Sequence, residues 1–251
     1  MGGGLPLNPS LTITAPGYRI RKQGCESMNV ITVASRGVGT GKTTLTARLA
    51  AVAQAQGHHS LVIDADPQGS LALCNSLHED GVPPIVTAER GIGRLLTMAT
   101  GNGYDWVFID TSSTMWVVAQ EAIRFATMVV IPARPGFREL AAVRETVNLA
   151  SARNKPYAVV FNAAPPKRGQ KEALVVRESR AFLDKYGIPV WSGQISERAD
   201  LAFSHAEGAG EADAQSSAAA EIARLWSAIE RSVEAVNAAR AGAGRAQERA
   251  A

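Results

Sequence analysis

The sequence predicts an α/β protein in which helices flank a doubly wound, mostly parallel sheet. Short apolar runs alternate with helical patterns along most of the chain. A glycine-rich loop of the phosphate-binding type joins the first apolar run to the first helical pattern, and carboxylates directly follow two further runs. Because parallel strands end at one edge of a sheet, the loop and the carboxylates are expected to form one site there.

Apolar residues continue through each run, which is typical of strands that are buried on both faces of a sheet. Among the helical patterns between the runs, Gly187 is expected to end one as a left-handed residue. The apolar stripe of the last helix is expected to pack on the sheet, with a partner-binding face as the alternative. The expected strands are Val30–Ala34, Leu61–Asp64, Trp106–Asp110, Met128–Pro132, Ala158–Phe161 and Ile188–Trp191, and the expected helices are Leu45–Gln56, Phe137–Ala152, Lys171–Tyr186 and Ser216–Ala239.

The chain has 251 residues, of which 46% are hydrophobic and 20% charged, as in soluble globular proteins with a sizeable core. No apolar run approaches the roughly 18 residues that a membrane-spanning helix needs, so no membrane partner is expected. The two cysteines, Cys25 and Cys74, are far apart and lack metal-ligand spacing. A cytoplasmic location is therefore expected, with association with the nucleoid left open.

The expected folded domain covers residues 28–239. Residues 1–27 contain glycines and prolines that interrupt any periodicity, and residues 240–251 are rich in Ala, Gly and Arg; both segments are expected to be flexible. Residues 1–27 and 237–251 each carry three cations and one anion, so the net charge of +3 leaves −1 for residues 28–236. The domain therefore lacks the overall basicity usual in nucleic-acid binders, although this total is compatible with a local basic patch.

Residues 35–44, Ser-Arg-Gly-Val-Gly-Thr-Gly-Lys-Thr-Thr, form the phosphate-binding pattern. Glycines let backbone N–H groups turn toward phosphate oxygens, and the N-terminus of the following helix adds unpaired donors. Lys42 is expected to reach the β- and γ-phosphates, and the Thr43 hydroxyl to ligate Mg²⁺. A glycine-rich turn without a ligand is the alternative, and Arg36 stands where full Walker A spacing has glycine. The loop residues expected to bind the nucleotide are Gly37, Gly39, Thr40, Gly41, Lys42, Thr43 and Thr44.

Three carboxylates stand at the predicted ends of two strands. Asp64 and Asp66 end the run Val62-Ile63-Asp64-Ala65-Asp66, and Asp110 ends the run Val107-Phe108-Ile109-Asp110 in the form of a Walker B strand. A lone aspartate in such a place is usually a helix cap, but three beside a phosphate loop favour metal and water chemistry. Mg²⁺ needs only one or two protein carboxylates when phosphates are present. The expected metal ligands are Thr43, Asp110 and Asp66.

From about Met28 to Ala239, the chain resembles the ParA/MinD partition ATPases, which are P-loop NTPases with a deviant Walker A loop. The resemblance rests on Ser35–Thr44, on Asp64-Ala65-Asp66-Pro67-Gln68-Gly69 and on Phe108-Ile109-Asp110-Thr111, in that order. It implies ATP and Mg²⁺ as cofactors and a nucleotide-dependent homodimer. It also implies nonspecific DNA binding and a ParB-like or cargo-adaptor partner.

The resemblance also implies roles for individual residues. Lys42 would bind phosphate and contribute to catalysis, and Asp110 would fill the Walker B role. Asp66 would orient the attacking water, with Asp64 in support. Asn162, after the run Ala158–Phe161, matches the family's adenine-reading asparagine, although an isolated asparagine there is also a common turn residue.

The chain departs from the family pattern in two places. Gly37 and Val38 occupy the positions of the family's signature Lys and the following Gly, so a cation that reaches the nucleotide of the partner subunit is missing. Its loss is expected to slow hydrolysis on the order of 10³-fold or more and to weaken dimerisation, unless Arg36 substitutes for it. The second departure, Thr111-Ser112-Ser113 in place of Thr-Pro-Pro, is expected to make that segment more flexible.

Three functions remain open from the sequence. The first is a ParA-like ATPase in DNA or cargo segregation, the second a nucleotide-binding regulator or scaffold impaired in hydrolysis, and the third a small-molecule P-loop kinase or ligase. The third lacks a second constellation of catalytic residues in the sequence. Candidate DNA-binding cations, which alternate with acidic residues, are Lys167, Arg168, Lys171, Arg177, Arg180, Lys185 and Arg198.

Overall fold

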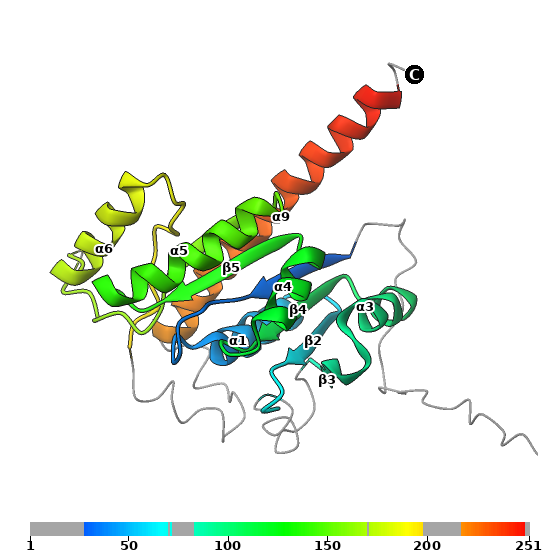
Figure 1. Cartoon of the computed structure of the whole chain (residues 1–251), viewed down its shortest axis with the longest axis horizontal. Coiled ribbons are helices and arrows are strands. Elements are labelled where there is room, and N and C mark those ends of the chain that lie inside the picture. Colours follow the sequence, from blue (N-terminus) through cyan, green and yellow to red (C-terminus); the bar gives the residue numbers. More distant parts are fainter. Residues whose placement is uncertain (1–27, 70, 72–82, 170, 198–216, 249–251) are drawn as a thin grey trace, which may run out of the picture.

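The computed structural model describes residues 28–69, 71, 83–169, 171–197 and 217–248. Within these ranges the protein contains one sheet of six strands, all parallel, in the order β3-β2-β4-β1-β5-β6 (Figure 1). The predicted fold class is therefore confirmed. The strands are β1 (Asn29–Val33), β2 (Ser60–Ala65), β3 (Ile85–Thr87), β4 (Trp106–Thr111), β5 (Met128–Ala133) and β6 (Tyr157–Phe161).

Helices cover both faces of the sheet, and alternate residues of its strands therefore belong to different apolar clusters. One cluster joins the sheet to α1 and α9, and two others join its opposite face to α3, α4, α5 and α6 (Figure 1). This two-sided burial explains why the strand sequences are almost wholly apolar. The helices are α1 (Lys42–Ala55), the 3₁₀ turn η1 (Ala88–Arg90), α3 (Ile92–Gly101), α4 (Trp116–Phe125), α5 (Phe137–Ala152), α6 (Leu174–Lys185) and α9 (Ser217–Glu248).

The register of the central strands aligns the ends that carry the predicted site. Val33, the last residue of β1, pairs with Asp110 of β4, and Asp110 pairs with Asp64 of β2. The loop that leaves β1 therefore begins level with both carboxylates. Since β1 lies between β4 and β5, this loop stands at the centre of the carboxyl edge, where open α/β sheets bind ligands.

Some local predictions need correction. Ile188–Trp191 is not a strand, since Val190 forms only an isolated bridge to Val159, and Pro189 has no N–H to donate. The three-residue strand β3 was too short for a pattern to predict. The last helix does not end at Ala239 but continues to Glu248, whereas residues 1–27 lie outside the described ranges.

The expected end of α6 is confirmed at Gly187. This residue has φ of 65°, and its N–H donates to the carbonyl of Asp184 at 2.9 Å. Glycine reaches this conformation without steric cost, which is why it commonly follows the last helical residue. Within the described ranges, no helix combines the length and apolar character needed to cross a membrane.

An aromatic cluster fixes α9 against the body of the protein. The fully buried Trp226 of α9 contacts Trp106 edge-on at 4.6 Å between ring centroids, and its indole N–H donates to the Gln56 side chain at 2.9 Å. His58 packs edge-on against both indole rings and contacts the carboxylates of Asp105 and Glu230 at 3.2 and 3.1 Å. The apolar stripe of the last helix thus packs on the sheet, as expected.

These contacts predict a pH-dependent contribution of His58 to stability. Its hydrogen bond to Asp105 is the largest cause that raises the His58 pKa above 6.5, against burial, with Glu230 adding to the rise. Because the raised pKa belongs to the folded state, the stabilisation is complete below about pH 6.5 and is lost as the pH rises through the folded pKa. In thermal melts, the advantage of the wild type over His58→Gln should shrink from pH 5.5 to pH 8.5. An advantage that stays constant over this range would contradict it, and Asp105→Asn should reduce the pH dependence.

Candidate functional site

The loop between β1 and α1 forms an open cradle at the N-terminus of a helix. Gly41, the residue before α1, has φ of 80°, and no side chain caps the helix. Gly39 also has a positive φ, of 68°. A Cβ at Gly41 would overlap the side-chain amide of Asn162, and the positive φ of this residue also favours glycine. The uncapped N–H groups and the left-handed glycines suit the binding of a phosphate group.

Lys42, the first residue of α1, provides a buried cation to this cradle. Its Nζ donates to the carbonyl of Gly37 at 3.0 Å, across the loop. Burial lowers the Lys42 pKa, and the nearby Asp110 and Asp66 carboxylates act in the opposite direction. A lysine so placed braces the loop and can supply positive charge to an anion that binds there.

Thr43 of α1 and Asp110 of β4, two of the residues predicted to bind Mg²⁺, contact each other directly. The Thr43 hydroxyl donates to Asp110 Oδ2 at 2.8 Å, and the Thr46 hydroxyl lies 3.5 Å from Asp110 Oδ1. The sequence interpretation missed Thr46, although it follows Thr43 by three residues and so lies on the same face of the helix. The contact joins a hydroxyl and a carboxylate, which are hard oxygen ligands suited to Mg²⁺.

Asp110 is a buried carboxyl group whose charged form a bound cation would stabilise. Burial is the main cause that raises the Asp110 pKa to about 7, and the carboxylates of Asp64 and Asp66 raise it further. The hydrogen bond from Thr43 and the charge of Lys42 lower it. In the described part of the chain, no three His, Cys, Asp or Glu side chains are grouped to hold a metal by themselves. These features fit a Mg²⁺ ion that takes its other ligands from phosphate and water.

Asp64 and Asp66 have different surroundings. Asp64 is buried, and its two carboxylate oxygens accept from the N–H groups of Asp66 and Leu71 at 3.0 and 3.1 Å. It therefore fixes the backbone beyond β2. Asp66 is half-buried, its Oδ1 accepts from the N–H of Gln68 at 3.0 Å, and its charge acts on both Lys42 and Asp110.

Asn162 connects the loop after β6 to the phosphate loop. Its Nδ2 donates to the carbonyl of Thr40 at 2.7 Å, an interaction across 122 residues of sequence. Thr40 itself is buried, and its hydroxyl lies 3.3 Å from the carbonyl of Gly37. The amide of Asn162 keeps a second N–H and an acceptor oxygen, the groups that an adenine edge requires.

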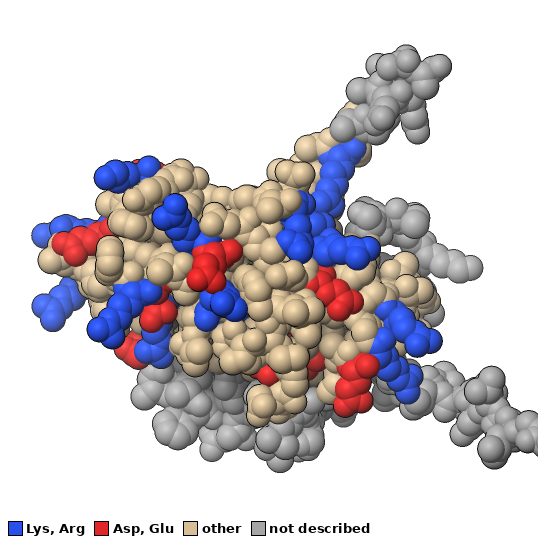
Figure 2. Space-filling model, in the orientation of Figure 1, with Lys and Arg blue, Asp and Glu red and all other residues tan. Residues whose placement is uncertain are grey.

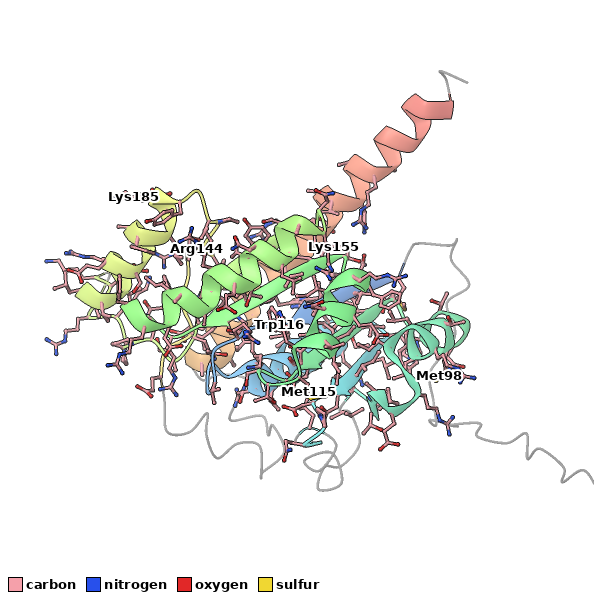
Figure 3. All side chains as sticks on the ribbon, viewed as in Figure 1. Met98, Met115, Trp116, Arg144, Lys155 and Lys185 are labelled. Carbon is pink, nitrogen blue, oxygen red and sulfur yellow. The ribbon has the colours of Figure 1, made fainter. Side chains whose placement is uncertain are left out.

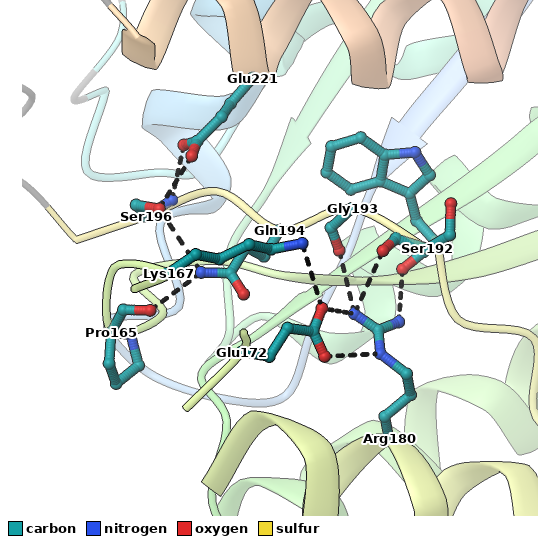
Figure 4. Close-up of polar contacts among 10 residues, drawn as sticks. Pro165, Lys167, Glu172, Arg180, Ser192, Gly193, Gln194, Ser196 and Glu221 are labelled. Atoms are coloured by element: carbon teal, nitrogen blue, oxygen red, sulfur yellow. Dashed lines mark hydrogen bonds and ion pairs between the residues drawn. The ribbon is translucent and has the colours of Figure 1, made fainter. Parts of the chain in front are cut away.

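A polar clamp holds the segment that runs beside Asn162. Arg180 of α6 pairs with Glu172 and donates to the carbonyls of Trp191 and Gly193 at 2.7 and 3.2 Å (Figure 4). Further along, Ser196 donates through its N–H and hydroxyl to Glu221, both at 2.8 Å. A parallel β-bridge between Ala164 and Ser196 then fixes the backbone that follows Asn162.

The structure also places the residues at which the chain departs from the ParA/MinD pattern. Arg36 does not face the loop interior, because its guanidinium pairs with Glu145 at 2.9 Å and lies over the ring of Trp116. Trp116 is the first residue of α4 (Figure 3). Val38 points outward, with 78% of its surface exposed, and its φ is not positive.

The segment after Asp110 has local order that the sequence did not predict. The hydroxyl of Ser112 accepts from the N–H of Thr114 at 3.2 Å and bonds its hydroxyl at 2.9 Å. Thr111 donates to the carbonyl of Val33 at 2.9 Å and so ties the end of β4 to β1. These side-chain hydrogen bonds thus restrict the backbone of a segment in which the family pattern has two prolines.

Comparisons with known proteins agree with this geometry. A family model described as the CobQ/CobB/MinD/ParA nucleotide binding domain matches residues 31–211. "Maintenance of carboxysome distribution protein A" of Gloeobacter kilaueensis is 30% identical over 176 residues, which are 66% of this chain and 76% of the relative.

Two solved structures have the same fold. The MinD cell division protein of Aquifex aeolicus has a TM-score of 0.63 at 20% identity over 80% of this chain and 97% of its own. A cobyrinic acid a,c-diamide synthase of Mycobacterium smegmatis, solved with an ATP analog and magnesium, has a TM-score of 0.64 at 18% identity over 82% of this chain and 95% of its own. The family match covers most of the chain, which therefore belongs to the CobQ/CobB/MinD/ParA family of nucleotide-binding proteins.

Proposed function

We propose that the protein is a Mg²⁺-dependent ATPase of the ParA/MinD type that positions or partitions a cargo. The observation that carries the proposal is the 2.8 Å contact between Thr43 and Asp110, beside the buried Lys42. These three residues bring a cation that can bind phosphate together with two oxygen ligands at the carboxyl edge of the sheet. Mg²⁺ bound there would neutralise charge on the terminal phosphates, while Thr43 and Asp110 hold it and Asp66 orients a water.

The role in positioning rests on the relatives. The carboxysome-distribution protein supports it by its name, and the likeness to MinD supports the fold on which such a role would be built. A nucleotide-dependent homodimer would form across the carboxyl edge, where Val38, Met115 and Val117 are exposed. Exposed apolar side chains beside a ligand site favour a protein contact there.

Nonspecific DNA binding has a smaller set of candidate cations than the sequence offered. Lys167 and Arg180 pair with Glu172, and Arg198 lies outside the described ranges. On the face shown in Figure 2, basic side chains gather over α5 and α6, with acidic ones between them. Combined replacement of Lys171, Arg177 and Lys185 by Ala should weaken binding of duplex DNA and lower its salt dependence if α6 and the segment before it form the contact surface.

The second candidate function is a nucleotide-binding regulator that hydrolyses ATP very slowly. The observation that favours it is the position of Arg36, whose guanidinium is held by Glu145 and Trp116 and so is not directed to the phosphates. Gly37 adds no cation either. The similarity to the cobyrinic acid a,c-diamide synthase concerns only the fold, and the sequence contains no second constellation of catalytic residues. The third function, a small-molecule ligase or kinase, therefore has no support beyond the fold.

Hydrolysis of ATP with Mg²⁺, with and without duplex DNA, tests the proposal on the wild type and Asp66→Ala. Asp66→Ala should lose turnover on the order of 100-fold or more and keep ATP binding, because a positioned carboxylate acts in the transition state. Asp66→Asn is the matched control for structure, since it keeps an acceptor for the Gln68 N–H but removes the charge. Stimulation by DNA would support partitioning.

Two other outcomes would contradict parts of this proposal. If the wild type binds ATP but shows no turnover under any of these conditions, the regulator remains. If Asp66→Ala turns over as fast as the wild type, the assigned role of Asp66 is wrong.

A further inference from the structure

The phosphate loop is surrounded by more anions than cations. The charges of Asp64 and Asp66 act on Asp110 next to the loop. Glu139, in the first turn of α5, also approaches the loop, because its Oε2 would lie 3.2 Å from a Cβ at Gly37. A nucleoside triphosphate would add several negative charges to this set. Lys42 alone leaves the site short of positive charge, even with one Mg²⁺.

One further cation touches the loop. Arg134 follows β5 at the carboxyl edge, and its Nε donates to the carbonyl of Gly39 at 3.0 Å. The arginine is exposed. Among the residues that the structure describes, no carboxylate forms an ion pair with it. The hydrogen bond to the loop uses only Nε, so the two terminal nitrogens of the guanidinium can donate to another acceptor.

We propose that Arg134 is the second phosphate-binding cation of this loop and contacts the γ-phosphate of ATP. The inference rests on the proposed nucleotide site and deepens it. An arginine is suited to the task, because its guanidinium stays charged and can bond a backbone carbonyl and a phosphate at the same time. It would supply the subunit's own nucleotide with a positive charge that Arg36, whose guanidinium pairs with Glu145, does not supply.

Affinities for ATP and ADP, measured by isothermal titration calorimetry with Mg²⁺, test the inference on the purified full chain. Arg134→Ala should weaken ATP on the order of tenfold or more and ADP much less, because a charge-assisted hydrogen bond to the γ-phosphate exists only with ATP. Arg138→Ala removes a nearby exposed arginine of α5 and is the matched control, with no expected change in the ratio.

A second variant separates charge from loop bracing. Arg134→Gln can still donate to the Gly39 carbonyl but carries no charge. If Arg134 only braces the loop, Arg134→Gln should bind ATP like the wild type, and this would overturn the inference. If it binds the γ-phosphate, Arg134→Gln should lose the preference for ATP as Arg134→Ala does.

Equal losses for ATP and ADP in Arg134→Ala, or no loss, would overturn the inference while nucleotide binding stands. A wild type that binds neither nucleotide would overturn both.

Discussion

Lys42→Ala should lower the affinity for ATP by about 100-fold or more. The Lys42 ammonium is buried in the loop and donates to the Gly37 carbonyl, so its removal takes away both the phosphate cation and a brace of the cradle. Each charge-assisted hydrogen bond to phosphate is worth about 1.5–3 kcal/mol, which corresponds to at least about tenfold in affinity. Titration of a fluorescent ATP analogue into both proteins measures the effect.

Lys155→Ala is the matched control for this substitution. Its ammonium also donates to a backbone carbonyl, that of Ala126 at 2.9 Å, but Lys155 precedes β6 at the amino edge of the sheet. The control removes a lysine with a comparable hydrogen bond from the opposite edge of the sheet, and the affinity of Lys155→Ala for ATP should stay within about twofold of the wild type. Unchanged ATP affinity in Lys42→Ala would contradict the phosphate-loop assignment itself.

Trp226→Ala should destabilise the protein by about 3–5 kcal/mol, the usual range for removal of a fully buried aromatic side chain. The indole fills the space between α9 and the sheet, contacts Trp106 and Phe108, and donates to Gln56. Such a loss is a large share of the free energy of unfolding of a domain, which is typically about 5–15 kcal/mol. Thermal and urea melts measure it, and a fall in melting temperature of about 10 °C or more is expected.

Trp116→Ala provides the comparison for Trp226. This tryptophan is half-buried at the start of α4, and its face carries the guanidinium of Arg36. Its removal should cost about 1 kcal/mol or less, because no cavity forms in the core. Similar losses in both variants would mean that α9 is not anchored through Trp226.

Much of the fold could be predicted because it depends on local pattern. The apolar runs locate β1, β2, β4, β5 and β6, since a strand covered on both faces has to be apolar throughout. Chain direction then places Asp64 and Asp110 level with the end of β1. The edge of the sheet was less predictable: β3 has only three residues, and Ile188–Trp191 is apolar without forming a strand.

Contacts between distant segments could not be predicted. Arg134 and Gly39 are 95 residues apart, and Asn162 and Thr40 are 122 residues apart. No periodicity links such pairs, because they meet only after the order of the strands is set. A rule that examines every polar residue after a strand would have included Arg134, which follows β5 directly. The direction of Arg36 toward Glu145 needed the placement of α5, which the sequence does not provide.

The hydrogen bond between Asn162 and Thr40 would couple the two ends of a nucleotide bound in the proposed site. The amide that would read the base also braces the backbone of the phosphate loop, next to Gly41. A base that displaced this amide would therefore change the conformation of the phosphate loop. A nucleotide with the wrong base would therefore be held differently at its triphosphate, so that discrimination between bases would appear as a difference in the rate of phosphate chemistry as well as in affinity.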